Sequence, residues 1–403
     1  MGLSQMAFPG AGNRDGDLRS STLVVRIISL ATFLIFFQGF MVAPLLPHLS
    51  AYFGVTVQQT SFIEPSYLLG YGAVTLIYAP LSDRYGRLPV ILFSLGCFIV
   101  LTICTGFSGT VNQMILFRLL TGLGAGGIAP TTISWISDTF SYEKRGHALG
   151  IFFGSMAGGT ALGSFAGALL EPLIGWSWLF FSVAAVGALI FVLLLQYRES
   201  FSSVPAAGAL SSGEIWPAIR EILGQRRAVG TYSYVLINAM FHSGVFTWLG
   251  YLLFRNYHLG ETGIGLSLLG YGIPGFVLGP FIGRMADKYG RNKIIPVGLA
   301  VGGVSAICLG CRLPLAASNI VVALLSLGFD MTHPLFAAIA TTLSSRKGLA
   351  TGLFAFFLFI GYGFGSLLFS LLVPYGLENT FILFGSAALV AALMATMVFR
   401  STR

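Results

Sequence analysis

Long apolar runs separated by short polar segments dominate the chain. A membrane-spanning helix needs about 20 mostly apolar residues, and helices are expected because an open sheet would leave backbone groups unpaired in lipid. The pattern predicts an all-α membrane protein with twelve transmembrane helices. The expected spans are 23–47, 57–80, 89–107, 111–137, 145–170, 175–196, 229–254, 261–285, 293–312, 318–343, 349–373 and 379–399.

The composition supports this fold class and narrows the chemistry. Hydrophobic residues make up 55% of the 403 residues and charged residues 9%, against about 25% charged residues in soluble domains. The four cysteines lie in or at the ends of apolar spans, which favours buried thiols over a metal site. We expect no metal, no cofactor, no removable signal peptide and no enzymatic activity.

The basic residues predict the orientation. If the N-terminus is cytoplasmic, every Lys and Arg except Arg118, Arg255 and Arg312 falls in a cytoplasmic loop or tail or at the cytoplasmic end of a span. Lys and Arg accumulate on the cytoplasmic side of membrane proteins, so both termini are expected there. This placement accounts for the net charge of +8 without a nucleic-acid partner.

The longest polar interruption divides the chain into two halves. We expect a flexible cytoplasmic N-terminus (1–22), an N-terminal six-helix bundle (23–196), a cytoplasmic linker (197–228), a C-terminal six-helix bundle (229–399) and a cytoplasmic tail (400–403). Within the linker, the isoleucines of EIWPAIREIL follow helical spacing and predict a short interfacial helix. Pro217 fits best in its first turn.

The two halves repeat each other. SDRYGRLPVI (82–91) matches ADKYGRNKII (286–295), Pro130 recurs as Pro334, and KRGHALGIF (144–152) resembles RKGLATGLF (346–354). Parallel repeats of six helices are typical of transporters that bind substrate near the membrane midplane and work by alternating access.

These features identify the chain as resembling the major facilitator superfamily, over about residues 23–399. The family's signature G-x-x-x-D-R/K-x-G-R-R/K occurs twice, beginning at Ala79 and at Gly283, although Ala79 and Leu88 depart from the pattern in the first copy. Acid and arginine at such a corner can pair with each other and with helix ends, so they form a conformational latch or else only fix the topology. The latch residues are Asp83, Arg84, Gly86, Arg87, Asp287, Lys288, Gly290 and Arg291.

Further motifs resemble the drug/proton antiporter branch of this family. FRLLTGLGAGG, which contains Arg118, is similar to the R-x-x-x-G-x-G motif that the branch links to proton transfer. The glycines of residues 150–167 resemble its fifth-helix motif, but Gly159 replaces the proline, and plain helix packing is the alternative. Several bacterial efflux members carry an acid in the first helix, where this chain has Gln38.

Asp330 and His333 are the strongest candidates for proton coupling. Both lie near the middle of the span 318–343, three residues apart and therefore expected on one helix face, and an intramembrane charge is functional by default. An imidazole beside a carboxyl group can share or relay its proton. The alternatives are an internal hydrogen-bonding anchor for Asp330 and a cap on a Pro334 kink for His333.

A second polar group is predicted in the N-terminal half. Glu64, Tyr67 and Tyr71 follow helical spacing, and Glu64 lies at a depth similar to that of Arg118, so the two could pair. An outer rim charge is the alternative for Glu64. In the seventh span, Tyr234, Asn238 and His242 follow one another at i, i+4 and i+8 and are expected to face the cavity. The predicted substrate-binding residues are Gln38, Tyr67, Tyr71, Asn238, His242 and Asp330, and the predicted proton-coupling residues are Asp330, His333, Glu64 and Arg118.

The sequence thus predicts a secondary transporter of the inner membrane. No GxxxxGK[ST] loop for ATP occurs in the sequence, so we expect protons to drive export of a small, partly hydrophobic compound. The expected partners are that small molecule, protons and the lipid bilayer, and the chain is expected to act as a monomer. A proton symporter that imports a nutrient or metabolite is the alternative.

Overall fold

The computed structural model describes residues 14–140, 142–198, 212–344 and 346–399, and every regular element in these ranges is helical. The N-terminal half contains α1 (Arg14–Phe40), η1 (Ala43–Leu45), α2 (Leu46–Phe53), α3 (Val57–Ser61), α4 (Ile63–Tyr85), α5 (Arg87–Gly106), α6 (Val111–Ala125), α7 (Ile128–Thr139), α8 (Tyr142–Ile174) and α9 (Trp176–Gln196). The linker contributes α10 (Ser212–Leu223). The C-terminal half contains α11 (Arg226–Tyr257), α12 (Glu261–Tyr289), α13 (Arg291–Gly310), α14 (Leu315–Asp330), α15 (His333–Ala340), α16 (Lys347–Leu372), η3 (Val373–Tyr375) and α17 (Leu377–Val398).

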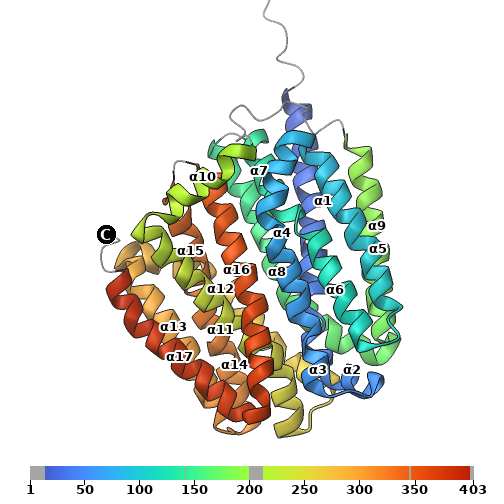
Figure 1. Cartoon of the computed structure of the whole chain (residues 1–403), viewed down its shortest axis with the longest axis vertical. Helices are drawn as coiled ribbons and strands as arrows, with labels where there is room; N and C mark the ends of the chain where they lie inside the picture. The colour runs from blue at the N-terminus through green and yellow to red at the C-terminus, as the bar shows by residue number, and fades with distance from the viewer. Residues whose placement is uncertain (1–13, 141, 199–211, 345, 400–403) are drawn as a thin grey trace, which may run out of the picture.

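The predicted fold class is confirmed. Ten helical stretches of the described chain are long and apolar enough to cross a membrane. Helices α4 and α12 are not among these ten, but with 23 and 29 residues they are also long enough to cross a membrane at 1.5 Å per residue. Together with the ten they give twelve spans in the described chain. Figure 1 shows the N-terminal half in blue to green beside the C-terminal half in yellow to red.

The internal repeat extends to the boundaries of the helices. Helix α5 begins at Arg87 and α13 at Arg291, and each follows a glycine with positive φ, 93° at Gly86 and 92° at Gly290. Side chains with a Cβ rarely adopt such a conformation. The signature loop is therefore the same sharp corner in both halves.

Both halves also break one span at the equivalent place. Helix α6 ends at Ala125 and α7 begins at Ile128, while α14 ends at Asp330 and α15 begins at His333. A proline ring clashes with the carbonyl group four residues earlier, which is Gly126 for Pro130 and Asp330 for Pro334. The prolines thus explain both breaks.

The two faces of the molecule differ in how tightly the halves pack. We call the face where α1 begins the terminal face (Figure 1, top), and the face with α2 and α3 the opposite face. Because successive spans run in alternating directions, the α4–α5 corner at Gly86 and the α12–α13 corner at Gly290 belong to the terminal face. Near the opposite face, Gln58 Nε2 donates to the Ser370 carbonyl oxygen at 2.9 Å, and Ser61 Oγ donates to Ser370 Oγ at 2.7 Å. These bonds join α3, at the start of the second span, to α16.

Packing between the halves continues to the middle of the bundle. Helix α4 packs on α16, and α8 packs on α12. A Cβ on Gly72 would lie 2.9 Å from the Ile360 backbone nitrogen. Near the terminal face, a Cβ on Gly150, Gly154 or Gly348 would meet open space. The halves are therefore closed together from the middle to the opposite face.

The linker helix α10 is amphipathic, with Ile219 and Ile222 buried and Trp216 exposed. An exposed tryptophan beside a buried apolar face is typical of a helix at the membrane interface. Pro217 lies in the second turn, not in the first as predicted, because the helix already begins at Ser212. Residues 1–13, 199–211 and 400–403, which include most of the predicted flexible segments, lie outside the described residues.

Candidate functional site

An aromatic and ionisable cluster occupies the centre of the C-terminal half. The His242 ring of α11 stacks on Phe329 of α14, with centroids 3.8 Å apart, and the Tyr271 hydroxyl of α12 lies 2.5 Å from His242 Nδ1. The predicted residue His242 therefore lies between α12 and α14. Tyr271 and Phe329, which the sequence analysis did not select, are its main partners.

Asp330 lies at the broken end of α14 beside this cluster. Ser326 Oγ donates to Asp330 Oδ2 at 3.1 Å, one helical turn earlier. The carboxylate is within electrostatic reach of the Tyr271 and Tyr362 hydroxyls. Asp330 is only partly buried, so the carboxyl group that accepts from Ser326 keeps some access to solvent.

The predicted common helix face of Asp330 and His333 is wrong. The helix ends at Asp330 and restarts at His333, so the two residues belong to different helical segments. The His333 ring instead stacks on Phe329 at 5.1 Å and packs on Phe354 at 5.4 Å. Phe329 consequently lies in contact with both imidazoles, and proton relay between Asp330 and His333 would need a bridging group.

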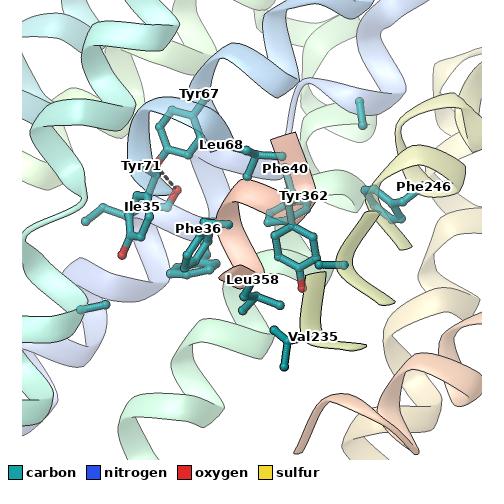
Figure 2. Packing of buried hydrophobic residues seen from close by; sticks show 14 of the residues in the cluster. Ile35, Phe36, Phe40, Tyr67, Leu68, Tyr71, Val235, Phe246, Leu358 and Tyr362 are labelled. Carbon is teal, nitrogen blue, oxygen red and sulfur yellow. Dashed lines mark hydrogen bonds between the residues drawn. The ribbon is translucent and has the colours of Figure 1, made fainter. Parts of the chain in front are cut away.

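An aromatic layer joins this cluster to the N-terminal half. Phe359 of α16 lies 4.3 Å from the Tyr71 ring and 5.8 Å from the Phe36 ring, and Tyr362 packs edge-on against Phe40 at 6.3 Å. Figure 2 shows Tyr71 and Phe36 on one side of this layer and Tyr362 on the other. Aromatic pairs of this kind contribute about 0.5–1.5 kcal/mol each beyond their buried area.

A small void of about 10 Å³ lies beside Gly39, Tyr67 and Tyr71. Such a volume holds about one water molecule. The predicted substrate residues Tyr67 and Tyr71 thus border the centre of the molecule in a closely packed state. A substrate would have to separate the aromatic rings in order to occupy this position.

Arg118 is fully buried and is held by the first span. Its guanidinium donates to Gln38 Oε1 at 2.6 Å and to the Gly39 carbonyl oxygen at 2.9 Å, and it lies 4.2 Å from the centroid of the Tyr67 ring. Gln38 therefore accepts a charged hydrogen bond where related efflux proteins were expected to carry an acid. A cation over an aromatic face is stabilised by the ring quadrupole.

Glu64 is also fully buried. Its carboxyl group lies near Thr247 of α11 and within electrostatic reach of Arg118. No ion pair within 4 Å joins Glu64 to Arg118 in the described chain. Glu64 and Arg118 therefore make no direct ion pair, because the Arg118 guanidinium donates its hydrogen bonds to Gln38 and Gly39. Neither Glu64 oxygen has a hydrogen-bond partner at normal distance among the described residues.

Asn238 is tied to the second break in the helices. Its Nδ2 donates to Thr332 Oγ1 at 3.0 Å, between Asp330 and His333 in sequence. Tyr234, one turn away, instead donates its hydroxyl to the Ala391 carbonyl oxygen of α17. The predicted polar face of α11 thus serves partly to hold the broken span and partly to pack the C-terminal bundle.

The glycines of α8 fall into two groups. A Cβ on Gly159, Gly163 or Gly167 would lie 2.4 to 2.6 Å from a backbone oxygen of the first span, whereas Gly150 and Gly154 face open space. Close helix packing accounts for the first group, as it does for small residues in other membrane bundles.

The first copy of the signature loop forms a charge cluster within the N-terminal half. Arg87 pairs with Asp83, and its NH2 group lies 2.9 Å from Asp138 Oδ2 at the end of α7. Arg84 lies over the Tyr85 ring at 5.4 Å. Asp138 thus joins the end of α7 to the signature loop.

The second copy has the same backbone corner at Gly290. Lys288 lies over the Tyr289 ring at 5.2 Å, and Arg291 begins α13. The side chain of Asp287 lies outside the described residues, so its partner is not assigned.

Comparison with known proteins gives the family. The sequence model of the Major Facilitator Superfamily matches residues 28–253 and 232–403. The chain is 27% identical over 325 residues to the uncharacterized MFS-type transporter YwfA of Bacillus subtilis (strain 168), covering 78% of this chain and 76% of the relative. It is 36% identical over 141 residues to Multidrug resistance protein 3 of the same organism, covering 35% of this chain and 28% of that relative.

Solved structures share the fold. A bacterial homologue of the human lysosomal transporter Spinster, in an inward-facing and occupied conformation, matches with a TM-score of 0.77 at 16% identity over 97% of this chain and 98% of that one. A D-xylose–proton symporter matches with a TM-score of 0.75 at 15% identity over 94% and 97% of the two chains. The chain therefore belongs to the Major Facilitator Superfamily and is a multi-pass membrane transporter of small molecules, not an enzyme.

Proposed function

We propose that this transporter exports a small, partly hydrophobic compound in exchange for protons. The observation that carries the proposal is the position of Asp330, a carboxyl group at a broken helix end beside the His242–Tyr271 pair and the aromatic layer between the halves. An ionisable group inside a membrane bundle is expensive to place there and is functional by default.

Relatives with efflux names support the direction of transport. Multidrug resistance protein 3 and the efflux pump dotC of Dothistroma septosporum, the latter 31% identical over 209 residues, are among them. The alignment with dotC covers 49% of this chain and 36% of that relative. The aromatic residues at the contact of the two halves suit a ligand with apolar surface.

In the proposed cycle, protonation of Asp330 and occupation by substrate exclude each other. Loss of the proton leaves a charge that the hydroxyls of Tyr271 and Tyr362 can stabilise as donors, and a change in these bonds would alter the contact of Tyr362 with Phe40 across the halves. His333 would relay the proton toward the terminal face through a bridging group. Substrate would contact Tyr67, Tyr71, Asn238 and His242.

Glu64 and Arg118 form the proposed second element of coupling. A carboxyl group buried beside Thr247 and near Arg118 would change its contacts on gaining or losing a proton. Because Thr247 belongs to α11, such a change would also act across the two halves. Gln38 would hold Arg118 in place throughout.

The proposed topology places the terminal face in the cytoplasm of a cell whose inner membrane holds the protein. The basic residues of the Gly86 and Gly290 corners support this orientation. The closed state of the opposite face would then be an inward-facing one, with the corner charges acting as a latch that forms when the terminal face closes. A monomer suffices for this cycle, and nucleic acid has no part in it.

Import by proton symport is the second candidate. Gln38 in place of a first-helix acid and Gly159 in place of the antiporter proline favour it, and the fold match includes a D-xylose–proton symporter. Symport would use the same Asp330 but would require substrate and proton to bind together.

Uptake of ethidium into everted membrane vesicles tests the proposal, because eversion turns export from the cell into transport into the vesicle lumen. The vesicles are prepared from a host without its own multidrug pumps and are energised by an inside-acid pH gradient. Wild-type protein should accumulate ethidium in the vesicles, and Asp330→Asn should lose at least nine-tenths of this accumulation while membrane insertion is retained. Equal accumulation by the two proteins would remove Asp330 from coupling.

A further inference from the structure

Three potential metal ligands meet at the opposite face, far from Asp330. His48 of α2 and Glu171 of α8 belong to the N-terminal half, and Glu261 is the first residue of α12 in the C-terminal half. His48 Nε2 lies 2.9 Å from Glu171 Oε1, and His48 Nδ1 lies 3.9 Å from Glu261 Oε1. One ligand atom from each residue lies within 4.8 Å of the other two.

The sequence predicted no metal site, because these residues come from three different spans with no local spacing motif. The fold brings them together where the two halves close. The packing there is tight, since a Cβ on Gly265 of α12 would lie 3.0 Å from the Ala168 Cβ of α8. The positions of Glu171 and Glu261 are therefore fixed by the backbones of α8 and α12.

Two carboxylates meet at this point across the boundary of the halves. The charged neighbours that act on Glu171, which is buried, are His48 and Glu261, and no Lys or Arg pairs with either glutamate within the described residues. Glu171 and Glu261 therefore face each other with His48 as their only cationic-type neighbour in the described chain. A divalent cation would neutralise both.

The ligand set favours a borderline first-row ion. One imidazole nitrogen and two carboxylate oxygens are ligands that Zn²⁺ accepts at about 2.0–2.2 Å, and a set of three protein ligands keeps one position open for water. Ca²⁺ and Mg²⁺ prefer oxygen ligands alone. Glu171 lies beside Nε2 and Glu261 beside Nδ1 of the same ring, so a rotation of the Glu261 side chain toward the Glu171 side of the ring would bring all three ligands onto one ion.

The cluster is reached from outside through a surface hollow of about 660 Å³. Tyr52 and Trp178, both mostly exposed, line it together with Trp176. The Tyr52 and Trp176 rings are 5.3 Å apart, which ties α2 to α9 beside the cluster. An ion in the compartment at the opposite face can therefore arrive without passing through the bundle.

We propose that His48, Glu171 and Glu261 form a Zn²⁺ site which the ion enters from the opposite face, and that the bound ion holds the two halves together there. Because ligands come from both halves, the site is complete only while this face is closed. A ligand that binds one of two states shifts the population toward it. Bound Zn²⁺ should therefore favour the state open at the terminal face and slow turnover.

Binding of Zn²⁺ alone to the purified full-length protein in lipid nanodiscs is the first test, measured by competition with a fluorescent zinc chelator. Wild-type protein should bind one ion per chain, and His48→Asn and Glu261→Gln should each weaken binding at least tenfold. Glu378→Gln is the matched control, because Glu378 is a carboxylate outside the cluster that pairs with Arg312. Absence of saturable binding, or binding equal in all four proteins, would overturn the site.

A cysteine at Ser61 tests the locking effect. Ser61 is fully buried at the contact of the halves near the opposite face, so Ser61→Cys should react with an impermeant maleimide only when that face opens. Zn²⁺ added on that side should slow the reaction severalfold, and Glu261→Gln should abolish this slowing. An unchanged labelling rate in the presence of bound Zn²⁺ would overturn the lock.

Discussion

At the scale of single residues, Arg118 is held by two backbone carbonyl oxygens and one amide side chain. Its NH1 group donates to the Gln38 carbonyl oxygen at 3.2 Å as well as to the Gln38 side chain, and its NH2 group donates to Gly39. Three bonds from a buried cation to one turn of α1 fix α6 against the first span. Arg118 therefore stabilises the N-terminal bundle whatever part it takes in proton movement.

Arg118→Ala should lower the free energy of unfolding by roughly 3 kcal/mol, since hydrogen bonds from a charged group contribute about 1.5–3 kcal/mol each and the orphaned acceptors are buried. Thermal unfolding of the protein in detergent measures the change as a drop in Tm. Gln38→Ala removes one of the three acceptors and should show a smaller drop. A wild-type Tm for Arg118→Ala would contradict this account.

Residue identities at the site could be predicted, but their partners could not. Asp330, Arg118 and Glu64 stand out in sequence because charge is rare in apolar spans. The bond from Arg118 to Gln38 and the contact of Tyr271 with His242 depend on how distant helices pack, which no local pattern encodes. The break after Asp330 was foreseeable from Pro334, whose ring clashes with the residue-330 carbonyl group.

At the scale of elements, α8 is shaped by glycines with different surroundings. A Cβ on Gly163 would lie 2.4 Å from the Phe37 carbonyl oxygen of α1, whereas a Cβ on Gly154 meets nothing within 4 Å. The same residue type on one helix thus serves close packing at one position and leaves space at another. The antiporter-like spacing of these glycines does not distinguish the two uses.

Gly163→Ala should therefore destabilise the protein by about 1–3 kcal/mol, the usual range for overpacking, by pushing α8 away from α1. Gly154→Ala is the control on the same helix and should leave stability unchanged or raise it slightly, because alanine favours helix over glycine. The Tm values of the two purified variants in one detergent give the comparison. Equal Tm values would show that the close contact of α8 with α1 does not determine the stability of the protein.

Elements were more predictable than sites, because a span is a property of local composition. The sequence placed twelve spans, and the repeat of α5 in α13 follows from SDRYGR and ADKYGR. The exception is α10, where Pro217 was assigned to the first turn but lies in the second. The helix begins at Ser212, ahead of the first isoleucine of the pattern.

At the scale of the whole molecule, the closed opposite face is the state that the structure presents. Ser61 and Ser370 hydroxyls are 2.7 Å apart across the halves, and Trp248 Nε1 donates to the same Ser370 Oγ at 3.0 Å. Alternating access requires these contacts to separate during each cycle.

A disulfide between Ser61→Cys and Ser370→Cys should therefore stop transport, in a background whose four native cysteines are replaced by serine. Oxidation should reduce ethidium efflux at least tenfold, and a reductant should restore it. The two single variants are controls and should be insensitive to oxidant. Full transport by the oxidised, cross-linked protein would mean that this face does not open.

Proton movement during substrate flux tests the central claim most directly. Purified wild-type protein and Asp330→Asn are placed in proteoliposomes loaded with a pH-sensitive dye, and an inward ethidium gradient is imposed with the membrane potential clamped at zero. Antiport predicts that the lumen becomes alkaline with wild-type protein and that its pH does not change with Asp330→Asn. Acidification of the lumen, or an unaltered response of Asp330→Asn, would contradict export in exchange for protons through Asp330.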